Sequence, residues 1–301
     1  MKSFCKQQMR LLMRKALTHF RALCLLFLLL FFSAPCSFAK ETTIHFLDAG
    51  EGDAILISTP NKKHTLIDTG TLITGPRIIK LLQSCGITEL QHLILTHPHP
   101  DHIGGAFPAF AYLSIQSVFD NGQPILNLNE SIYRWYQELV RSHHHYSTLH
   151  KGERLTLDQE VSLESLWPPK QQLSDDWNTN SLVLKIKAHE TEILLMGDAN
   201  FDTEKALLRS AEQKLNAHIL KAGHHGSART GSPEFIKAVK PQQVVISVNS
   251  NNYWGYPDAD TLRRYSASGA TLRQTSKFGN LAVIISDKSY TISEHAKLCS
   301  Q

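Results

Sequence analysis

The sequence predicts an α/β fold of the α+β kind, in which helices cover the outer faces of two mixed β-sheets. Segments typical of strands alternate with segments of helical spacing from residue 43 onward. Pairs of strands that resemble hairpins occur near both ends of this region, which indicates mixed rather than wholly parallel sheets. No stretch rich in Pro, Gly or Ser interrupts it, so we expect one domain.

The first half of this region begins with two apolar or alternating runs, which predict a hairpin. Gly50 and Gly52 lie between the runs and favour a tight turn. The first helix has apolar residues at helical spacing and is expected to end at Gly86. We predict strands at 43–47, 53–58, 64–68 and 92–96, and helices at 75–85, 104–113 and 131–142.

The second half contains a further hairpin and then an alternation of helices and strands. Trp167, Pro168 and Pro169 end its first strand, because proline cannot donate to a sheet. Pro233 lies just inside the start of a helix, where a missing N–H costs nothing. We predict strands at 161–166, 182–188, 192–196, 218–221, 243–248 and 281–285, and helices at 203–210, 232–239 and 259–268.

The first 39 residues have the order of a secretory signal peptide. Six basic residues and no acidic ones precede an apolar run at 22–32, and small residues follow at Ser37 and Ala39. The apolar run is 11 residues long, too short to cross the roughly 30 Å bilayer core as a helix. We expect cleavage after Ala39, which leaves residues 40–301 as one domain in the periplasm or outside the cell. An uncleaved membrane anchor is the alternative.

The composition excludes several classes of protein. The chain has 301 residues, of which 42% are hydrophobic and 19% charged, as in a globular protein with a full core. The net charge of +4 comes from the signal segment, because the rest of the chain has 25 Lys and Arg against 27 Asp and Glu. No global basic surface for nucleic acid is therefore expected. Cys85 and Cys299 are the two cysteines after the signal, and the sequence leaves their pairing open.

The strongest chemical signal is the motif THPHPDH at 96–102, directly after a predicted buried strand. Histidine nitrogens and carboxylate oxygens are good ligands for zinc and similar divalent metals. The two prolines of the motif are expected to prevent a helix and to hold the loop extended or turned. Side chains of so short a loop can converge on one point, so we predict a metal site here.

Two further polar clusters follow predicted strands. One is Met196-Gly197-Asp198, and the other is the segment KAGHHGS at 221–227. Taken alone, the first is more typical of a turn or a helix N-cap, and the second is as compatible with a turn as with a metal site. Together with the first motif they provide enough ligands for two metals roughly 3.5–4 Å apart that share a carboxylate. The candidate metal ligands are His97, His99, Asp101, His102, Asp198, His224 and His225.

These motifs resemble those of the metallo-β-lactamase fold superfamily, whose signature is the HxHxDH pattern at 97–102. Their order is similar to one branch, the metallohydrolase domain of the ComEC competence (DNA-uptake) proteins and their stand-alone relatives. The segments that carry this similarity are FLDAGEGDA at 46–54, LIDTG at 66–70, NTNSLVL at 178–184, LMGDA at 195–199 and KAGHHGS at 221–227. The resemblance implies a four-layer αββα sandwich with its site at the sheet edges.

The resemblance also implies the roles of the ligands. His97 and His99 would hold one divalent metal, Asp101 and His102 the other, and Asp198 would bridge them. Two metal ions are expected, with Zn²⁺ favoured and Mn²⁺ as the alternative. They would activate a water for attack on an electrophile, which in the ComEC branch is a phosphodiester phosphorus.

Further roles follow from the same resemblance. One of His224 and His225 would complete the second metal site, and its neighbour would touch the substrate. Asp101, Asp198 and His225 are the expected catalytic residues. Substrate contacts are expected from Asn178, Ser227 and Tyr256.

The sequence departs from the family pattern in two places. Many members have a further His where this chain has DWNTN at 176–180, so Asn178 would offer only a weak ligand. The branch often has GHPH where this chain has GYPD at 255–258, and Tyr256 could donate a hydrogen bond to a substrate oxygen. Nothing in the chain resembles the ComEC membrane channel, so only the hydrolase is implied.

Several residues near the motifs have two interpretations. Lys221, Arg229 and Lys277 are candidates for contact with a phosphate. Four aromatic residues either stack on a flat group of a substrate or pack within the fold. They are Trp167, Trp177, Tyr253 and Trp254.

The sequence therefore predicts a secreted metal-dependent hydrolase that acts on a phosphodiester, with DNA as one candidate substrate. It implies no stable protein partner, and the mature chain is not expected to span a membrane. Two alternatives stay open: hydrolysis of a lactone, thioester or β-lactam, and a non-catalytic domain with a structural metal.

Overall fold

The structure is a computed structural model that describes residues 9, 13, 41–125, 131–171 and 174–299. The chain divides into two compact units, 1–39 and 40–301. The predicted cleavage site and nearly all of the predicted signal lie outside the described residues. No described helix combines the length and apolar character that crossing a bilayer requires. All elements discussed below belong to the second unit.

One sheet has eight strands in the order β15-β14-β1-β2-β3-β4-β5-β6. Its strands from β14 to β3 pair in antiparallel fashion and those from β3 to β6 in parallel, so the sheet is mixed. The strands are β1 (Thr42–Phe46), β2 (Ile55–Ser58), β3 (His64–Ile67), β4 (Glu89–Leu95), β5 (Ser114–Asp120), β6 (Tyr146–Thr148), β14 (Leu281–Ile285) and β15 (Tyr290–Ser293).

The other sheet has seven strands in the order β13-β12-β11-β10-β9-β8-β7. The strands from β10 to β13 are parallel and those from β7 to β10 antiparallel. The strands are β7 (Arg154–Asp158), β8 (Val161–Trp167), β9 (Val183–Ala188), β10 (Thr191–Leu195), β11 (Ile219–Lys221), β12 (Gln243–Ile246) and β13 (Thr271–Gln274).

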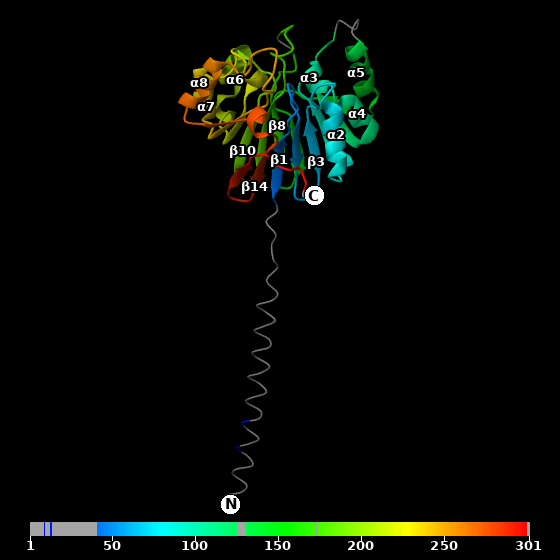
Figure 1. Ribbon diagram of the computed structural model, residues 1–301, viewed down its shortest axis with the longest axis vertical. Helices are drawn as coiled ribbons and strands as arrows, with labels where there is room; N and C mark the ends of the chain where they lie inside the picture. Colours follow the sequence, from blue (N-terminus) through cyan, green and yellow to red (C-terminus); the bar gives the residue numbers. More distant parts are fainter. Residues whose placement is uncertain (1–8, 10–12, 14–40, 126–130, 172–173, 300–301) are drawn as a thin grey trace, which may run out of the picture. The chain divides into compact units, whose positions relative to one another are not determined.

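Helices cover the outer face of each sheet, which confirms the predicted αββα arrangement (Figure 1). The eight-stranded sheet carries α2 (Gly75–Ser84), α3 (Pro100–Ile103), α4 (Ala106–Tyr112) and α5 (Ser131–Ser142). The seven-stranded sheet carries α6 (Phe201–Ala211), α7 (Pro233–Val239) and α8 (Ala259–Ala267), and the short α9 (Thr275–Phe278) follows β13. Short 3₁₀ turns lie at Glu212–Lys214 and Gly223–Gly226.

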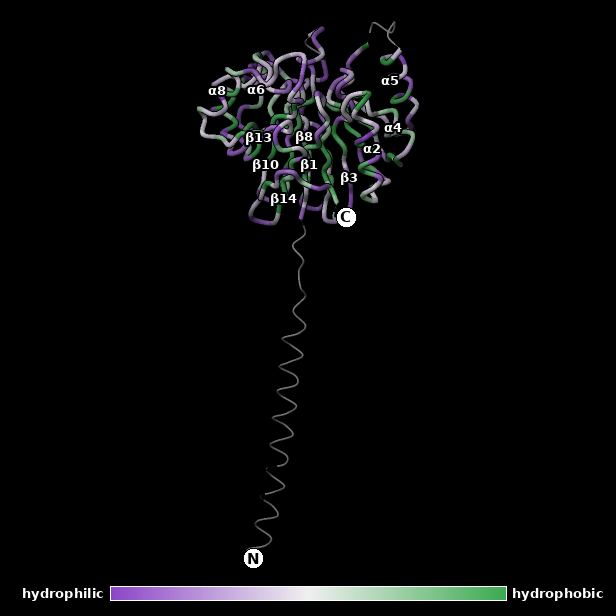
Figure 2. Tube along the Cα trace, viewed as in Figure 1, coloured by the Kyte–Doolittle hydropathy of each residue, from purple (hydrophilic) through white to green (hydrophobic). Residues whose placement is uncertain are grey.

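Three apolar clusters hold these layers together. The central one joins the facing sides of the two sheets, for example Ile44 and Phe46 of β1 with Leu184 and Ile186 of β9. The other two lie between each sheet and its helices. Figure 2 shows the apolar colour concentrated on the strands and the polar colour on the connecting loops. Because burial of apolar surface drives folding, this arrangement leaves the loops free to carry polar side chains.

Several elements were not expected from the sequence. Strands β5, β6, β7, β13 and β15 and helix α9 are absent from the prediction. Most of these strands lie at or near a sheet edge and bury only some of their residues. A partly exposed short strand lacks the apolar run or regular alternation by which a strand is recognised.

Two local predictions are wrong. The prolines of the THPHPDH motif were expected to prevent a helix, yet α3 begins at Pro100, where proline is tolerated in a first turn. The connection between β1 and β2 is also longer than a tight turn, since the strands end at Phe46 and resume at Ile55. Gly52 in this connection lies against the α3 backbone, and a Cβ there would come within 1.9 Å of the Asp101 carbonyl oxygen.

The structure also answers the question of the cysteines. Cys85, directly after α2, forms a disulfide with Cys299. The bond ties the end of the chain to the first helix of the domain.

Candidate metal centre

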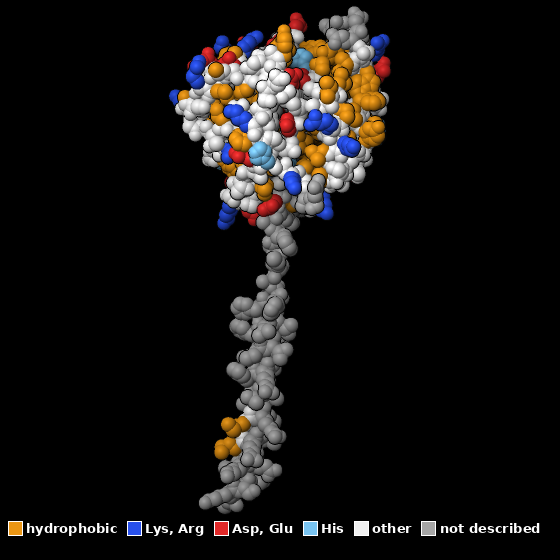
Figure 3. All heavy atoms as spheres, viewed as in Figure 1, with side chains coloured by type: hydrophobic (Ala, Val, Ile, Leu, Met, Phe, Trp, Pro, Cys, Tyr) orange, Lys and Arg blue, Asp and Glu red, His pale blue; other side chains and the backbone are white. Residues whose placement is uncertain are grey.

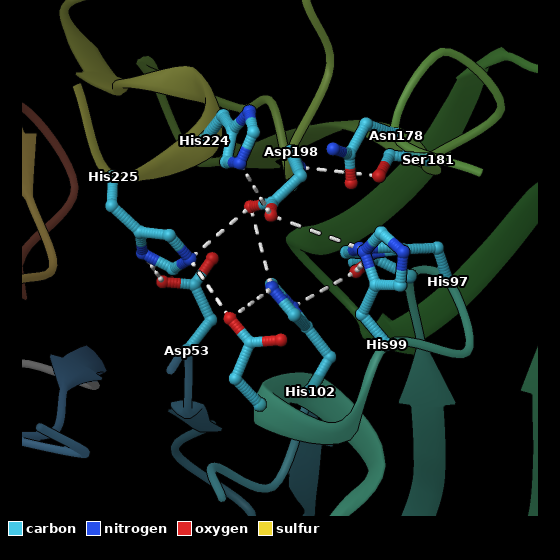
Figure 4. Close-up of polar contacts among 12 residues, drawn as sticks. Asp53, His97, His99, His102, Asn178, Ser181, Asp198, His224 and His225 are labelled. Atoms are coloured by element: carbon cyan, nitrogen blue, oxygen red, sulfur yellow. Dashed lines mark hydrogen bonds and ion pairs between the residues drawn. The ribbon is translucent and has the colours of Figure 1, made fainter. Parts of the chain in front are cut away.

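The predicted ligands come together because each follows the carboxyl end of a strand in a parallel part of a sheet. His97 and His99 follow β4, and α3 then presents Asp101 and His102. Asp198 follows β10 in the facing sheet. Carboxyl ends of parallel strands meet at one sheet edge, where α/β proteins place their sites. Figure 4 shows the side chains of His97, His99, His102 and Asp198 pointing toward one another.

One group of convergent ligand atoms consists of Asp101, His102, Asp198 and His225. The Nε2 atom of His225 lies 3.3 Å from Asp101 Oδ2 and 3.5 Å from Asp198 Oδ1. The Nε2 atom of His102 lies 3.3 Å from Asp198 Oδ1 and 3.6 Å from Asp101 Oδ2. Two nitrogens and two carboxylates thus surround one point, which is a donor set that suits zinc and similar divalent metals.

A second group consists of His97, His99 and Asp198. The His97 Nε2 and His99 Nδ1 atoms lie 2.9 Å apart, and His97 Nε2 lies 3.7 Å from Asp198 Oδ2. Asp198 therefore contributes one carboxylate oxygen to each group. A carboxylate shared in this way is what a pair of metal ions requires.

The two adjacent histidines of the third motif are not equivalent. His225 belongs to the first group, whereas His224 belongs to none of the convergent groups found among the described residues. The His224 Nε2 atom lies 3.9 Å from Asp198 Oδ2. Both residues have left-handed backbone angles, with φ of 42° and 52°. This strained turn directs the two side chains differently.

Polar neighbours fix the ring orientation of two ligands. The Nδ1 atom of His102 lies 2.8 Å from Asp68 Oδ2, and the Nδ1 atom of His225 lies 3.0 Å from the Ser247 carbonyl oxygen. A nitrogen beside an oxygen acceptor carries the proton, so Nε2 of each ring keeps its lone pair for the centre. Asp68 is itself held by Thr96, whose backbone N and Oγ1 donate to it at 2.7 Å each.

The carboxylates favour a positive charge at the centre. Burial alone lowers the pKa of His102, but Asp198, Asp68 and Asp101 together raise it well above its usual value. Burial likewise raises the pKa of the Asp198 carboxyl, but the histidines around it hold that pKa well below its usual range. A divalent cation satisfies this negative potential as a proton does.

Three other histidines of the site differ from His102. Burial lowers the pKa of His97, His99 and His224. These imidazoles are therefore neutral at pH 7, which is the form that binds a metal or accepts a proton.

Polar atoms without partners show that the residues fit a bound metal. His102 Nε2, Asp198 Oδ1 and His225 Nε2 are buried and have no hydrogen-bond partner. A buried polar atom without a partner costs about 1–3 kcal/mol. Three such atoms within one group are explained if each binds a cation.

A buried ion pair behind the centre was not predicted. Lys221 and Asp53 are both almost fully buried, and their charged groups are in contact. Lys221 Nζ also donates to the Gly197 carbonyl oxygen at 3.1 Å. The expectation that Lys221 contacts a phosphate is therefore wrong, because its ammonium joins the segments that carry Asp198 and His225 instead. The sequence shows Asp53 in one motif and Lys221 in another, but no pattern in it indicates that the two residues form a pair.

The centre opens into a cleft of about 700 Å³. Asn178 and Tyr256 line it, as do His224 and Asp198. Ser227 is buried and lies outside this lining. The structure thus places two of the three predicted substrate residues at the cleft.

The four aromatic residues near the motifs lie in different surroundings. Trp167 is buried in the core and donates to the Thr179 carbonyl oxygen. Trp177 packs on His99 with ring centroids 5.4 Å apart. Trp254 lines the cleft, and Tyr253 is exposed beside it.

Comparison with known proteins agrees with this geometry. Residues 47–110, which include the HxHxDH motif, match the model of the metallo-beta-lactamase superfamily. The chain carries a metallo-β-lactamase superfamily domain. The metallo-β-lactamase domain is similar in structure to CmlA, a diiron β-hydroxylase from Streptomyces venezuelae, with a TM-score of 0.54 and 13% identity. That alignment covers 82% of this chain and 54% of CmlA, and it shows a shared fold alone.

Curated relatives of the metallo-β-lactamase domain include competence proteins. The chain is 30% identical to competence protein ComA of Neisseria gonorrhoeae over 80% of its own length and 32% of that protein. It is 25% identical to ComE operon protein 3 of Bacillus subtilis over 86% of its own length and 35% of that protein. The chain thus spans about a third of the length of these relatives, so the similarity concerns one part of each.

Proposed function

We propose that this protein is an exported metal-dependent hydrolase that cleaves a phosphodiester. The observation that supports this most directly is the shared Asp198 carboxylate, with one oxygen near each of two ligand groups at the bottom of a cleft. The order of motifs shared with the ComEC branch favours a phosphodiester as the electrophile, with DNA as one candidate.

The protein's own side chains would supply the positioning. Two divalent cations in the two groups would act as Lewis acids and lower the pKa of a coordinated water to about 7. Asp198 would hold the two groups at a fixed separation. Ser247 and Asp68 would keep the His225 and His102 rings oriented through their Nδ1 atoms. Preorganised ligands of this kind need not rearrange during the reaction.

Residues on the cleft wall would bind the substrate. Burial and the nearby Asp198 carboxylate raise the pKa of the Tyr256 hydroxyl, so it stays protonated and can donate to a phosphate oxygen. His224 lies beside Tyr256 with ring centroids 5.5 Å apart. As a neutral imidazole at the cleft, His224 is placed to exchange a proton with a leaving group.

The disulfide supports export. Disulfides persist in oxidising compartments and are rare in the cytosol of mesophiles. Cys85 and Cys299 are the two cysteines that follow the predicted signal peptide, and they are bonded to each other. This pairing suits a protein of the periplasm or the cell exterior.

The test uses the unit of residues 40–301, which contains the complete described core. The protein is loaded with Zn²⁺ or Mn²⁺, and its metal content and its cleavage of bis(p-nitrophenyl) phosphate and single-stranded DNA are measured. We expect up to two metals per chain and metal-dependent cleavage that Asp198→Ala abolishes. Asp202→Ala, the same change at an exposed aspartate, should leave both metal content and cleavage intact.

Each other outcome identifies a different function. Two bound metals with cleavage of a lactone, thioester or β-lactam, but of neither phosphodiester, would contradict the proposal and favour hydrolysis of that bond. Bound metal with no hydrolysis of any of these substrates would favour the non-catalytic alternative.

A further inference from the structure

The rim of the metal cleft carries half of the exposed large apolar side chains in the described part of the domain. Among the described residues from 41 to 299, six such side chains are more than half exposed, and three of them line the cleft. These three are Leu72, Ile73 and Trp254, which are 56%, 81% and 66% exposed. Tyr253 packs edge-on against Trp254, with ring centroids 5.3 Å apart. Apolar side chains this exposed at a site mark a place where a ligand covers them.

The apolar rim has two sides. Leu72 and Ile73 belong to the loop after β3 of the eight-stranded sheet, whereas Tyr253 and Trp254 belong to the loop after β12 of the seven-stranded sheet. The Tyr253 backbone N–H donates to Glu51 Oε1 at 3.3 Å, which links the aromatic loop to the β1–β2 connection. A ligand at the metal centre would thus meet apolar groups contributed by both sheets.

The charges of the cleft do not suit a polyanion. Its charged lining residues other than histidine are Glu51, Asp101 and Asp198, and no Lys or Arg is among the described residues that line it. Proteins that bind a polynucleotide neutralise several phosphates with Lys or Arg. When the two ligand groups hold metal ions, their positive charge would balance the negative charge of one phosphate. The described lining residues include no Lys or Arg that could balance the charge of further phosphates.

We propose that this cleft selects a compact phosphodiester with a single negative charge whose non-reacting group is apolar or aromatic. This inference rests on the proposed phosphodiesterase function and narrows it. Trp254 and Ile73 hold the non-reacting group while the metal centre takes the phosphate. A polynucleotide is excluded as the preferred substrate because its flanking phosphates would lie over carboxylates and apolar side chains.

The test compares substrates with the same leaving group. Bis(p-nitrophenyl) phosphate and methyl p-nitrophenyl phosphate release the same p-nitrophenolate and differ in whether an aryl or a methyl group remains on phosphorus. We expect the metal-loaded protein to favour the aryl ester in kcat/KM by about tenfold, the scale of one stacked ring, mainly through KM. Trp254→Ala and Ile73→Ser should reduce this preference toward unity.

Tyr112 provides a matched control. It is an aromatic residue of α4 that is 65% exposed and does not line the cleft. It belongs to the side of the molecule where Figure 3 shows apolar side chains gathered over α4 and α5. Tyr112→Ala should keep the full aryl preference.

Three results would overturn the inference. The first is an aryl preference that survives both rim variants, and the second is equal kcat/KM for the two esters in the unchanged protein. The third is cleavage of oligothymidylate with a kcat/KM above that of both esters and a steep decrease with salt, which would indicate polynucleotide binding.

A binding measurement separates this inference from the proposed function. Diphenyl phosphate has poor leaving groups and serves as a probe of binding without turnover. We expect it to quench tryptophan fluorescence in the metal-loaded protein and not in Trp254→Phe, whether or not any ester is cleaved. Absence of cleavage together with this quenching would reject the phosphodiesterase and keep the apolar binding site. Absence of quenching would reject the binding site.

Discussion

Asp68 Oδ2 lies 2.8 Å from His102 Nδ1, and both side chains are closed to solvent. Asp68 adopts a left-handed backbone conformation with φ of 57°, which non-glycine residues rarely adopt. Its carboxylate also accepts two hydrogen bonds from Thr96. The residue thus binds the strand end of the HxHxDH motif and one of the motif's own ligands at the same time.

Loss of the Asp68 carboxylate should weaken metal binding. In Asp68→Asn the amide no longer holds the proton on His102 Nδ1, so the ring is free to take the wrong tautomer. Removal of such an outer partner typically lowers metal affinity by about 10–100-fold. Titration with Zn²⁺ by calorimetry measures the effect. Asp48→Asn, at an exposed position near the first connection, should leave the affinity unchanged, and an equal loss in both variants would reject the role of Asp68.

The ion pair of Lys221 with Asp53 should contribute to stability because neither partner is solvated. Lys221→Met leaves the Asp53 carboxylate buried without its partner, which costs about 3–5 kcal/mol. Arg154→Met removes the exposed end of the Arg154–Glu164 pair and should cost at most about 1 kcal/mol. Urea unfolding of both variants measures the difference. The double variant Lys221→Met, Asp53→Asn should recover part of the loss, and no recovery would mean that the pair is not the cause.

The metal ligands and the residues that hold them in place differ in how far the sequence predicts them. The ligands were predictable because His97, His99 and Asp198 each stand just after an apolar run, and carboxyl ends of parallel strands converge. Their grouping in space follows from that rule and from the family resemblance. The helix-and-sheet layers were predictable for the same reason, since a buried strand is a visible apolar run.

The partners of these ligands were not predictable in the same way. Asp53 and Lys221 are distant in the chain, and each alone has an ordinary surface interpretation. The choice between His224 and His225 depends on two left-handed backbone angles that no residue pattern announces. Edge strands such as β6 and β15 bury too few side chains to produce a periodic pattern of apolar residues in the sequence. Contacts between distant segments therefore account for most of what the sequence did not show.

Acid should destabilise the fold in part through His45. This residue of β1 is 6% exposed, and burial lowers its pKa to about 4. Its unfolded pKa is about 6.5, so between these values the unfolded chain binds more protons than the folded one. The stability that His45 contributes is complete above pH 6.5 and is lost as the pH falls toward 4, by about 1.4 kcal/mol per pH unit.

A substitution isolates this contribution. His45→Gln should lose less stability between pH 7 and pH 5 than the unchanged protein, as measured by urea unfolding at each pH. His144→Gln, at an exposed position, should follow the unchanged protein. The comparison between variants is the decisive quantity because other groups titrate in the same range, such as His92, whose pKa burial also lowers to about 4. Identical slopes in all three proteins would contradict the assignment.

The disulfide should stabilise the domain mainly through the unfolded chain. It joins positions separated by 214 residues, and closing so long a loop is worth up to about 5 kcal/mol in the chain-entropy account. Cys85→Ser with Cys299→Ser should lower the unfolding temperature by several degrees, and a reductant should lower that of the unchanged protein to a similar value. A reductant effect that persists in the double variant would show that the bond is not responsible.

Asn178 offers a gain-of-binding prediction. It lines the cleft on the side of the His97, His99 and Asp198 group, and its buried Oδ1 has no hydrogen-bond partner. That group has three ligands, whereas a structural zinc site has four. Asn178→His would place an imidazole where the chain now has a weak amide ligand. We expect the affinity for the metal bound by this three-ligand group to rise by about tenfold or more, which is the size of change in metal affinity that residues around a site typically cause.

Cobalt provides the measurement for this prediction, since its absorption reports the number of ligands. Titration of Asn178→His with Co²⁺ should give two saturating steps at lower metal concentration than in the unchanged protein. Asn251→His adds the same residue at an exposed position outside the cleft lining and should leave both steps in place. If Asn178→His gave the same titration as Asn251→His, the three-ligand group would not be short of a ligand, and Asn178 would act on the substrate alone.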